Sequence, residues 1–503
     1  MNLMMLLEMA RSGFAERVAV RSGGSDLSYA QLFAAARAAA AELRASGAEH
    51  AVLLDVSSPA MPVLLFGSAW AGLPFAPLSY RLTGRELDGL MERIEPCYVV
   101  TDTERAASLG GRTGVTAVSR EAFLRTARAG GAGSEAGDWS MDPEAIAVLL
   151  FTSGTTGAPK AAVLRQRHLV SYVLGSLEFG SAGEDEATLV AVPPYHVAGI
   201  AAVLSSVYTG RRIVQLPSFE AGAWLELARA ERVTHAFVVP TMLARIVDAL
   251  EGRASADLPH LRALAYGGGK MPQSVIEKAM ALFPGTDFTN AYGLTETSST
   301  IAVFTPDDHR AAAASGDPAV RRRLVSVGRP LPSVEVEIRD EDGKPVAAGE
   351  RGEVHVRGEQ VSGEYLGRGS ATLAGGWFPT RDAGSLDAEG YLFLEGRIDD
   401  VIVRGGENLS PGEIEDVLLE HEAVADCAVV GIPDEQWGEA VAAAVVLREG
   451  RSAGEAELRS WVKEHLRSSR VPQVIRFRGE LPYSETGKLL RRVVRAELVG
   501  GAS

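Results

Sequence analysis

Residues 149–169 read LLFTSGTTGAPKAAVLRQRHL, and no other stretch of this chain carries as much information about its architecture. An apolar strand runs into a loop of small and hydroxyl residues, and Pro159, Lys160 and a helix follow. Glycines let the backbone turn tightly and expose its N–H groups, while the hydroxyls and Lys160 add donors and positive charge. The stretch therefore predicts a flexible phosphate-binding loop, with a spacing that differs from the GxxxxGK[ST] P-loop. The loop residues are Thr152, Ser153, Gly154, Thr155, Thr156 and Gly157.

Apolar strands alternate with helices on both sides of this loop. Residues 27–47 are alanine-rich with helical spacing and end at a glycine, and AVLLDV (51–56) follows as a buried strand. The same rhythm returns in HAFVVP (235–240) and LRALAYGG (261–268). This alternation predicts an α/β fold with a parallel sheet and crossover helices.

The pattern changes after about residue 305. Residues 333–358 alternate apolar and polar side chains around turn signals, which predicts antiparallel strands. From residue 400 a compact mixture of helices and strands follows, and EGRIDD (395–400) is the predicted junction.

Composition narrows the class of protein. Of 503 residues, 46% are hydrophobic and 23% charged, as in a soluble globular protein, and the net charge of −15 argues against nonspecific nucleic-acid binding. Cys97 and Cys427 form neither a disulfide framework nor a metal cluster with nearby histidines. Four prolines interrupt the uncharged run 56–80, and the apolar N-terminus lacks a basic region. We therefore expect a cytoplasmic protein without a membrane span.

Six segments in order resemble the ANL superfamily of adenylate-forming enzymes, in its acyl-CoA synthetase branch. Besides the loop, they are VPPYHVAG (192–199), LAYGGGKMP (264–272), NAYGLTETSS (290–299), GRIDDVIVRGGENLSPGEIE (396–415) and ELPYSETGKLLRR (480–492). The resemblance covers nearly the whole chain. It implies a large N-terminal domain (1–396) of stacked αβ sheets with a β-barrel-like subdomain, and a small mobile α+β C-terminal domain (397–503).

The resemblance also implies roles for individual residues in binding ATP or acyl-AMP and Mg²⁺. Thr295 contacts the α-phosphate, Glu296 helps to hold Mg²⁺, His196 gates the carboxylate pocket and Lys488 is the adenylation lysine. A carboxylate beside a triphosphate is costly unless a hard cation bridges them, which supports the role of Glu296. Besides the loop and Lys160, the implied nucleotide contacts are Gly268, Gly269, Asn290, Ala291, Tyr292, Asp382 and Arg397.

The remaining implied roles concern coenzyme A, the hinge and the acid. Gly405 and Gly406 line the tunnel for the pantetheine arm. Glycine suits these positions because it lets the thin thiol arm pass close to the main chain. Asp399 is the hinge. The expected pocket walls are apolar or small, which favours a bulky hydrophobic monoacid: Tyr195, Val197, Gly199, Phe237, Val239, Tyr266, Gly267 and Ser298.

Two positions depart from the family pattern, and both replace glycine. Ala161 follows Lys160, where alanine costs little if the backbone is helical. Arg381 precedes Asp382, the implied ribose ligand. In an extended strand Arg381 would face away from the nucleotide. If glycine is required there, its guanidinium would crowd the ATP site, pair with Asp382 or trap phosphate, and adenylation would suffer more than thioester formation.

We therefore expect an AMP-forming acyl-CoA ligase that converts a bulky hydrophobic carboxylic acid and coenzyme A into the thioester through an acyl-AMP intermediate. One alternative is an enzyme that only forms the thioester, from an adenylate supplied by a separate adenylating enzyme. Another is a free-standing activator that loads a carrier protein. A nonenzymatic nucleotide sensor and an oxidative luciferase are less favoured, and the sequence carries no signal for an oligomeric state.

Overall fold

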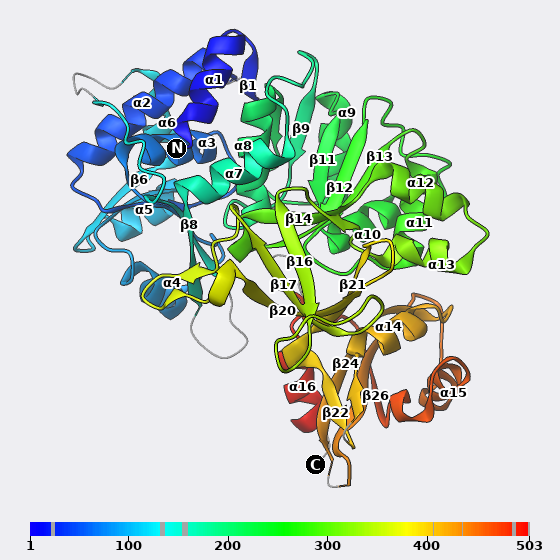
Figure 1. Cartoon of the computed structure of the whole chain (residues 1–503). Helices are drawn as coiled ribbons and strands as arrows, with labels where there is room; N and C mark the ends of the chain where they lie inside the picture. Colours follow the sequence, from blue (N-terminus) through cyan, green and yellow to red (C-terminus); the bar gives the residue numbers. More distant parts are fainter. Residues whose placement is uncertain are drawn as a thin grey trace.

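The structure is a computed structural model that describes residues 1–21, 26–130, 136–152, 159–405, 407–434, 436–484 and 489–500. Its large N-terminal domain contains two large sheets with helices around and between them, and a small C-terminal domain lies at the lower end (Figure 1). This α/β architecture with a large and a small domain is the predicted fold class.

A nine-stranded sheet carries most of the predicted strands of the second half of the large domain, in the order β15-β14-β13-β12-β11-β9-β10-β1-β2. Strands β10, β9, β11, β12 and β13 are parallel, so their carboxyl ends share one edge. The bounds are β1 Val18–Arg21, β2 Leu27–Ser28, β9 Ala187–Val190, β10 Arg212–Gln215, β11 His235–Val238, β12 Ala263–Gly267, β13 Asp287–Leu294, β14 Ser299–Phe304 and β15 Arg329–Pro330.

An eight-stranded sheet holds the first half of the domain, in the order β19-β18-β8-β7-β4-β3-β5-β6. Its bounds are β3 His50–Leu54, β4 Phe75–Pro77, β5 Cys97–Thr101, β6 Val115–Ser119, β7 Ile146–Thr152, β8 Lys160–Arg165, β18 Glu364–Tyr365 and β19 Gly369–Ser370. Strands β7 and β8 are antiparallel, with Thr152 opposite Lys160.

The strand β8 directly after the loop was not predicted, whereas the helix expected beyond Lys160 forms as α7. The run AAVL (161–164) is buried in β8, where it pairs with β7 on one side and, through Ala162, with Tyr365 of β18 on the other. Pairing with strands distant in sequence outweighs the helical propensity of alanine. The helix α7 begins at Gln166, directly after β8 ends at Arg165.

The largest core lies between these two sheets. Side chains of α2, α3 and α8 meet there with Leu53 of β3 and Ile213 of β10. Ser28 and Gln31 form a capping box at the start of α2, and the alanines of α2 let α3 approach closely. A methyl group at Gly67 of α3 would lie 2.8 Å from the Cβ of Ala39.

The helices of the large domain follow the strands in alternation. They are α1 Met4–Phe14, α2 Tyr29–Ala45, α3 Ala60–Ala71, α4 Gly84–Met91, α5 Thr103–Leu109, α6 Arg120–Arg128, α7 Gln166–Ser176, α8 Val197–Thr209, α9 Ala221–Ala230, α10 Pro240–Ala249, α11 Gln273–Leu282, α12 Pro306–Ala314 and α13 Pro318–Arg321.

The predicted antiparallel region forms a four-stranded sheet, in the order β16-β17-β20-β21, beside the other two. Its strands are β16 Val334–Arg339, β17 Gly352–Gly358, β20 Phe378–Leu386 and β21 Leu392–Arg397.

Short 3₁₀ turns occur in both domains. They are η1 Thr295–Thr297, η2 Arg322–Val325, η3 Ala374–Gly376, η4 Ile398–Asp400 and η5 Ser468–Arg470.

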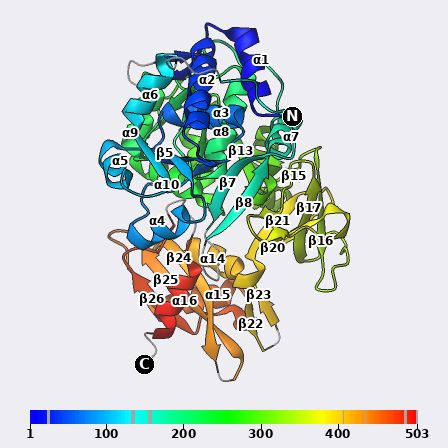
Figure 2. The same ribbon diagram turned by 90° about the vertical axis from the view of Figure 1, so that its left-hand side faces the viewer.

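The small domain packs three helices on a sheet of five strands, in which β26 pairs with β25 beside the path β23-β22-β25-β24. Figure 2 shows it below the large domain, next to β20 and β21. Its elements are β22 Ile402–Arg404, β23 Glu407–Leu409, α14 Pro411–Leu419, β24 Val424–Asp434, β25 Gly438–Leu447, α15 Glu455–His465, β26 Val474–Arg478 and α16 Arg491–Gly500.

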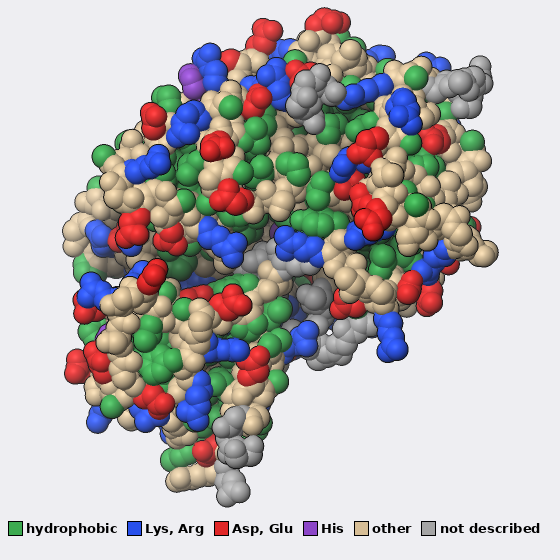
Figure 3. Space-filling model, turned by 180° about the vertical axis from the view of Figure 1, so that it is seen from behind, with side chains coloured by type: hydrophobic (Ala, Val, Ile, Leu, Met, Phe, Trp, Pro, Cys, Tyr) green, Lys and Arg blue, Asp and Glu red, His purple; other side chains and the backbone are tan. Residues whose placement is uncertain are grey.

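Acidic and basic side chains are interspersed over the face in Figure 3 rather than gathered into one basic surface. Among the described residues, no helix is both long and apolar enough to cross a membrane. Cys97 and Cys427 are both buried and free.

Candidate active site

The carboxyl edge of the nine-stranded sheet gathers residues from three of the motifs. His196 follows β9 as the N-cap of α8, Gly268 follows β12, and Glu296 lies in η1 directly after β13. Ligands of open α/β sheets bind at this edge, because the loops that leave parallel strands meet there. Motifs that are well separated in sequence, from His196 to Glu296, therefore share one site.

Glycine is required at the end of β12. A Cβ on Gly267 would lie 2.1 Å from the backbone oxygen of Ala291 on β13, and Gly268 has a φ of +82°. A side chain at either position would displace β13 or strain the turn. The sequence GGG thus keeps β12 close to the strand that carries the nucleotide motif.

Tyr292, Asp382 and Arg397 form a hydrogen-bonded trio from β13, β20 and β21. The Tyr292 hydroxyl donates to Oδ2 of Asp382 at 2.6 Å, and Nη1 of Arg397 donates to Oδ1 at 2.9 Å and to the Thr380 carbonyl at 3.0 Å. Burial, and then the charge of Asp382, raise the pKa of Tyr292 well above its usual range. Three residues expected around the nucleotide are therefore in direct contact.

Arg397 also has an unsatisfied donor. Its Nε is buried and has no hydrogen-bond partner among the described residues. Because a buried unpaired N–H group is costly, it suits an oxygen of a bound ligand. The Oγ of Ser298, in left-handed backbone with a φ of +58°, is likewise buried and unpartnered.

Glu296 and Lys160 are connected by Tyr365, a residue that the sequence motifs did not indicate. The Tyr365 hydroxyl donates to Oε1 of Glu296 at 2.7 Å, and Nζ of Lys160 lies 5.4 Å from the centre of the Tyr365 ring. Burial, and then Glu296, raise the pKa of Tyr365. No local pattern around Tyr365 could have revealed this position, since Glu296 is 69 residues away in sequence.

Glu296 is suited to be one ligand of a magnesium ion whose other ligands come from a nucleotide and water. Within the described residues, no hydrogen bond or ion pair engages its second carboxylate oxygen, Oε2, and no group of three or more His, Cys, Asp or Glu is arranged to hold a metal. Mg²⁺ in such sites takes one or two carboxylates and completes its octahedron with phosphate oxygens and water. A single hard oxygen ligand fits that chemistry.

His196 is neutral in this environment. Burial lowers the pKa of His196 to about 4, and Nδ1 accepts a hydrogen bond from the Ala198 N–H at 3.2 Å. The ring proton is thereby assigned to Nε2. Gly199, one turn further, has to be glycine because its Cβ would lie 2.8 Å from the Pro193 oxygen.

The expected acid-pocket residues divide between two faces of the sheet. Phe237 is half-buried next to Gly267, and a Cβ on Gly268 would lie 3.6 Å from Val239. Val197 and Ser298 are buried, and Tyr195 is half-buried with its ring edge-on to Tyr80 at 6.0 Å.

Tyr266 does not lie on the face that carries Phe237, which corrects its assignment to the pocket. It is fully buried, and its hydroxyl lies 2.9 Å from Nε2 of His309 on α12. Paired residues of parallel strands point to one side, and Tyr266 pairs with Val238 and Asn290.

Asn290 therefore shares that helix-packed face, where its amide donates to the Ser326 carbonyl at 3.0 Å. Its side chain is thus engaged on the helix-packed face and does not point to the face of Phe237, which differs from its expected role. The same alternation places Ala265 and Thr289, both half-buried and not expected from the motifs, on the face of Phe237.

Arg381 adopts left-handed backbone, with a φ of +64°. It belongs to a bulge in which residues 380–382 of β20 oppose the single residue Val354 of β17. The side chain is half-exposed, and Nη2 donates to Oδ1 of Asp399 at 2.6 Å. The guanidinium thus pairs with the expected hinge residue and not with Asp382, because the bulge rather than a regular strand sets its direction.

The expected coenzyme A loop lies on the small domain. Gly405 has a φ of +58°, its N–H donates to the Trp437 carbonyl at 2.8 Å, and a Cβ there would lie 2.8 Å from the Trp437 ring. The half-exposed Trp437 was not expected from the motifs. Several expected residues lie outside the described part of the chain: Ser153, Gly154, Thr155, Thr156, Gly157, Gly406 and Lys488.

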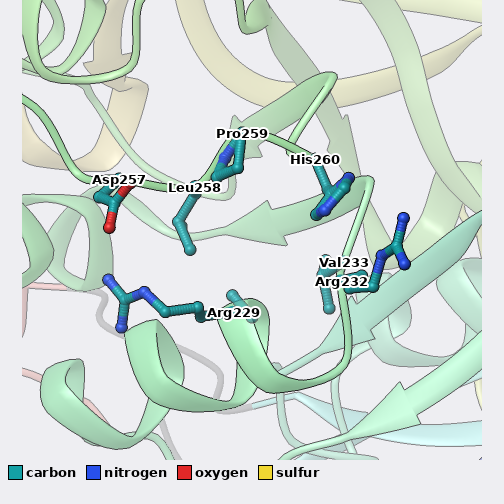
Figure 4. Close-up of a pocket in the computed structure, with 8 residues that line it drawn as sticks. Arg229, Arg232, Val233, Asp257, Leu258, Pro259 and His260 are labelled. Atoms are coloured by element: carbon teal, nitrogen blue, oxygen red, sulfur yellow. The ribbon is translucent and has the colours of Figure 1, made fainter.

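A surface cavity of about 200 Å³ lies elsewhere, beyond the amino ends of β11 and β12. Figure 4 shows Arg229 and Arg232 in its wall with their guanidinium groups extended in different directions, so they do not converge on one ligand. This cavity is separate from the carboxyl-edge site.

Two family models together cover most of the chain. The model described as AMP-binding enzyme matches residues 7–366, and the model described as AMP-binding enzyme C-terminal domain matches residues 413–488. The chain belongs to the AMP-binding enzyme family, which confirms the resemblance to the ANL superfamily.

Similar proteins of known function are ligases. A feruloyl-CoA synthase from Amycolatopsis sp is 33% identical over 484 residues, with 95% of each chain covered. An indoleacetate–CoA ligase from Aromatoleum aromaticum is 33% identical over 500 residues, covering 95% of this chain and 94% of that protein. A fatty acid–[acyl-carrier-protein] ligase from Streptomyces coeruleorubidus is 30% identical over 501 residues, covering 96% and 94%.

Solved structures have the same fold. The o-succinylbenzoate CoA synthetase from Bacillus subtilis, in complex with its acyl-adenylate intermediate, superimposes with a TM-score of 0.84 at 28% identity and covers 97% of both chains. The same enzyme has also been solved with ATP and a magnesium ion, with a TM-score of 0.83. These ligands agree with the cofactors expected from the sequence.

Proposed function

We propose that this chain is an AMP-forming acyl-CoA ligase for a bulky hydrophobic, aromatic monoacid. The observation that carries the proposal is the convergence of His196, Gly268 and Glu296 on one sheet edge, beside the Tyr292–Asp382–Arg397 trio. The small and apolar face of Phe237, Ala265 and Gly267 supports a bulky acid, as do the aromatic acids named for two relatives.

In the first step, a carboxylate oxygen of the acid attacks the α-phosphorus of ATP, and pyrophosphate leaves. Thr152, Lys160, Thr295 and Lys488 serve as donors to the phosphates, and positioning with charge neutralisation lowers the barrier. Glu296 would hold Mg²⁺, which neutralises phosphate charge when bound. The neutral His196 offers Nε2–H at the entrance to the carboxylate pocket.

In the second step, the sulfur of coenzyme A attacks the acyl carbonyl carbon and AMP leaves. Between the steps, the small domain, residues 397–503, rotates about Asp399, withdraws Lys488 and brings Gly405 and Gly406 to the site. Rotation lets one site serve both steps in turn.

The test is a panel of acids with ATP, Mg²⁺ and coenzyme A. We expect acid-dependent pyrophosphate exchange and equal amounts of AMP and thioester with ferulate, indoleacetate or a related aromatic acid, and little with acetate or malonate. Preference for a small or dicarboxylic acid would contradict the proposed substrate class. Absence of ATP binding and of any product would contradict the ligase function and favour a nonenzymatic role.

The thioester-only alternative rests on Arg381. Because its guanidinium pairs with Asp399 at 2.6 Å and leaves Asp382 to Tyr292 and Arg397, we rank the complete two-step reaction first. If the unmodified protein lacks exchange but forms thioester from feruloyl-AMP, the alternative gains support. Arg381→Gly should then restore exchange, and a separate enzyme would have to supply the adenylate.

The carrier-loading alternative is supported by one relative, which is a fatty acid–[acyl-carrier-protein] ligase. Competition between coenzyme A and a phosphopantetheinylated carrier protein at equal concentration separates the two acceptors. We expect the thioester of coenzyme A to predominate.

A further inference from the structure

Tyr365 connects two groups that the proposed function assigns to the phosphates of ATP. Its hydroxyl donates to Oε1 of Glu296 at 2.7 Å, while Nζ of Lys160 lies 5.4 Å from the centre of its ring. Cations are attracted to the face of an aromatic ring at this distance. One side chain thus contacts the expected magnesium ligand and the expected phosphate lysine.

The backbone around Tyr365 is held on both sides. On one side, Tyr365 pairs with Ala162 of β8, and the Leu366 N–H donates to the Ala161 carbonyl at 2.9 Å. On the other side, the N–H groups of Ser362 and Gly363 donate to the Glu296 carbonyl at 2.8 and 3.2 Å. Segment 362–366 therefore connects the strand after the phosphate loop to the turn that carries Glu296.

An ion pair fixes the same segment further. Arg165, at the end of β8, binds Glu364 with two hydrogen bonds of 2.8 Å, from Nε and Nη2 to the two carboxylate oxygens. A bidentate pair of this kind restricts orientation as well as distance. The backbone of Tyr365, the next residue, is therefore held in a defined position.

We propose that Tyr365 is a positioning residue for the Mg²⁺–ATP complex, acting through Glu296 and Lys160. This inference rests on the proposed function. The hydroxyl donates its hydrogen bond to Oε1 of Glu296 and so leaves Oε2 for the ion. The ring would keep Lys160 close to the phosphates. Partners that orient a metal ligand in this way change metal affinity by about 10- to 100-fold when removed.

Equilibrium binding tests the inference without turnover. ATP is titrated into the unmodified protein and Tyr365→Phe by calorimetry over a range of Mg²⁺ concentrations, and AMP is titrated without Mg²⁺. Tyr365→Phe keeps the ring beside Lys160 and removes only the hydroxyl. We expect the Kd for ATP in Mg²⁺ to rise about tenfold, and the Kd for AMP to stay within about twofold, because AMP needs no magnesium ligand.

Tyr98→Phe is the matched control. Tyr98 also donates a hydroxyl hydrogen bond to a glutamate, Glu42, but it lies in β5, away from the carboxyl-edge site. It should leave both affinities unchanged. Equal weakening of ATP and AMP in Tyr365→Phe would indicate a merely structural role and overturn the inference, as would an unchanged Mg²⁺ dependence.

A double-mutant cycle tests whether the hydroxyl of Tyr365 acts through Glu296. If the hydroxyl acts through Glu296, adding Tyr365→Phe to Glu296→Gln should weaken Mg²⁺–ATP binding by less than about twofold further. Independent, multiplying effects would overturn the inference. An unmodified protein that binds no Mg²⁺–ATP would overturn the proposed function itself, whereas normal binding with a silent Tyr365→Phe would overturn this inference alone.

Discussion

Ala161 and Arg381 both occupy positions where the family pattern has glycine, but their backbones differ. Ala161 is buried in the regular strand β8, opposite Phe151. Arg381 is in a bulge with a φ of +64°, where a residue with a Cβ is strained by about 1 kcal/mol or more. Only at Arg381 does the backbone itself favour glycine.

Substitutions at the two positions should therefore have opposite signs. We expect Arg381→Gly to be more stable than Arg381→Ala by about 1 kcal/mol, because glycine adopts left-handed backbone freely. Ala161→Gly should instead lower the free energy of unfolding by about 1 kcal/mol, through chain entropy and a lost buried methyl group. Chemical denaturation of the three variants measures both differences. Greater stability of Arg381→Ala would contradict the strain at this position.

At the scale of elements, the two faces of β12 have different tasks. Tyr266 connects the sheet to α12 through His309, while Gly267 and Ala265 belong to the face of Phe237. The strand thus holds the domain together on one side and borders the proposed acid site on the other.

Variants on the two faces should separate stability from specificity. Tyr266→Phe removes one buried hydrogen bond and should cost about 1 kcal/mol of stability without changing which acid is preferred. Phe237→Ala should instead shift the ratio of kcat/KM between a large and a small acid by about 10-fold or more. Acid-panel kinetics together with thermal unfolding check the pair. A changed acid preference in Tyr266→Phe would indicate that Tyr266 lines the acid pocket after all.

Periodicity identified elements well where the signal is local. The predicted helix at 27–47 is α2, Tyr29–Ala45, and HAFVVP and LRALAYGG contain β11 and β12. β8 was missed, because its alanines and valine become a strand only through pairing with β7 and β18. The register between strands, which decides the face of Tyr266, likewise arises from long-range packing.

Sequence motifs predicted the part of the site that lies at the carboxyl ends of strands. His196, Gly268 and Glu296 could be placed together because parallel strands share a carboxyl edge. Tyr365 and the direction of Arg381 could not, since each depends on a partner from another sheet or segment. A missing glycine signalled that Arg381 was unusual but not that Asp399 would be its partner.

At the scale of the whole molecule, buried histidines of the large domain make its stability depend on pH. Burial is the main cause that lowers the pKa of His168 to about 3 and that of His309 to about 4. In the unfolded chain both histidines have a pKa of about 6.5. Between these values the unfolded chain binds protons that the folded protein excludes, so stability present above about pH 6.5 is lost as the pH falls toward 4.

We expect each of these histidines to reduce the free energy of unfolding by about 1.5 kcal/mol between pH 6.5 and pH 5. Urea denaturation at the two pH values measures the loss. In His309→Gln, the loss should be smaller by about that amount. An identical loss in this variant would show that His309 does not contribute to the pH dependence.

The two domains are also connected by ion pairs. Nζ of Lys270, just after β12, donates to Oδ2 of Asp416 at 2.6 Å and to the Gly412 carbonyl at 3.1 Å, both on α14. Arg381 and Asp399, 51% and 43% exposed, form a second pair at the junction. Pairs this exposed contribute about 0–1 kcal/mol and weaken as salt is added.

Domain orientation should therefore respond to salt. Fluorophores on Leu174→Cys and Phe477→Cys, at exposed positions of the two domains, would report it by energy transfer, since the native cysteines are buried. We expect the transfer efficiency to change between low and high salt. In Arg381→Asn, which tolerates left-handed backbone without a charge, the change should be smaller. An equal salt response in both proteins would exclude Arg381 as its origin.

The pair between Arg381 and Asp399 distinguishes this chain from one that follows the family pattern and has glycine at this position. A glycine at this position would lack the pair, whereas the arginine adds to the junction a contact that weakens as salt is added. In dilute buffer the pair would contribute to the orientation of the two domains, and in concentrated salt that contribution would be lost. A single replaced glycine would thus make the solution surrounding the protein one of the determinants of its turnover.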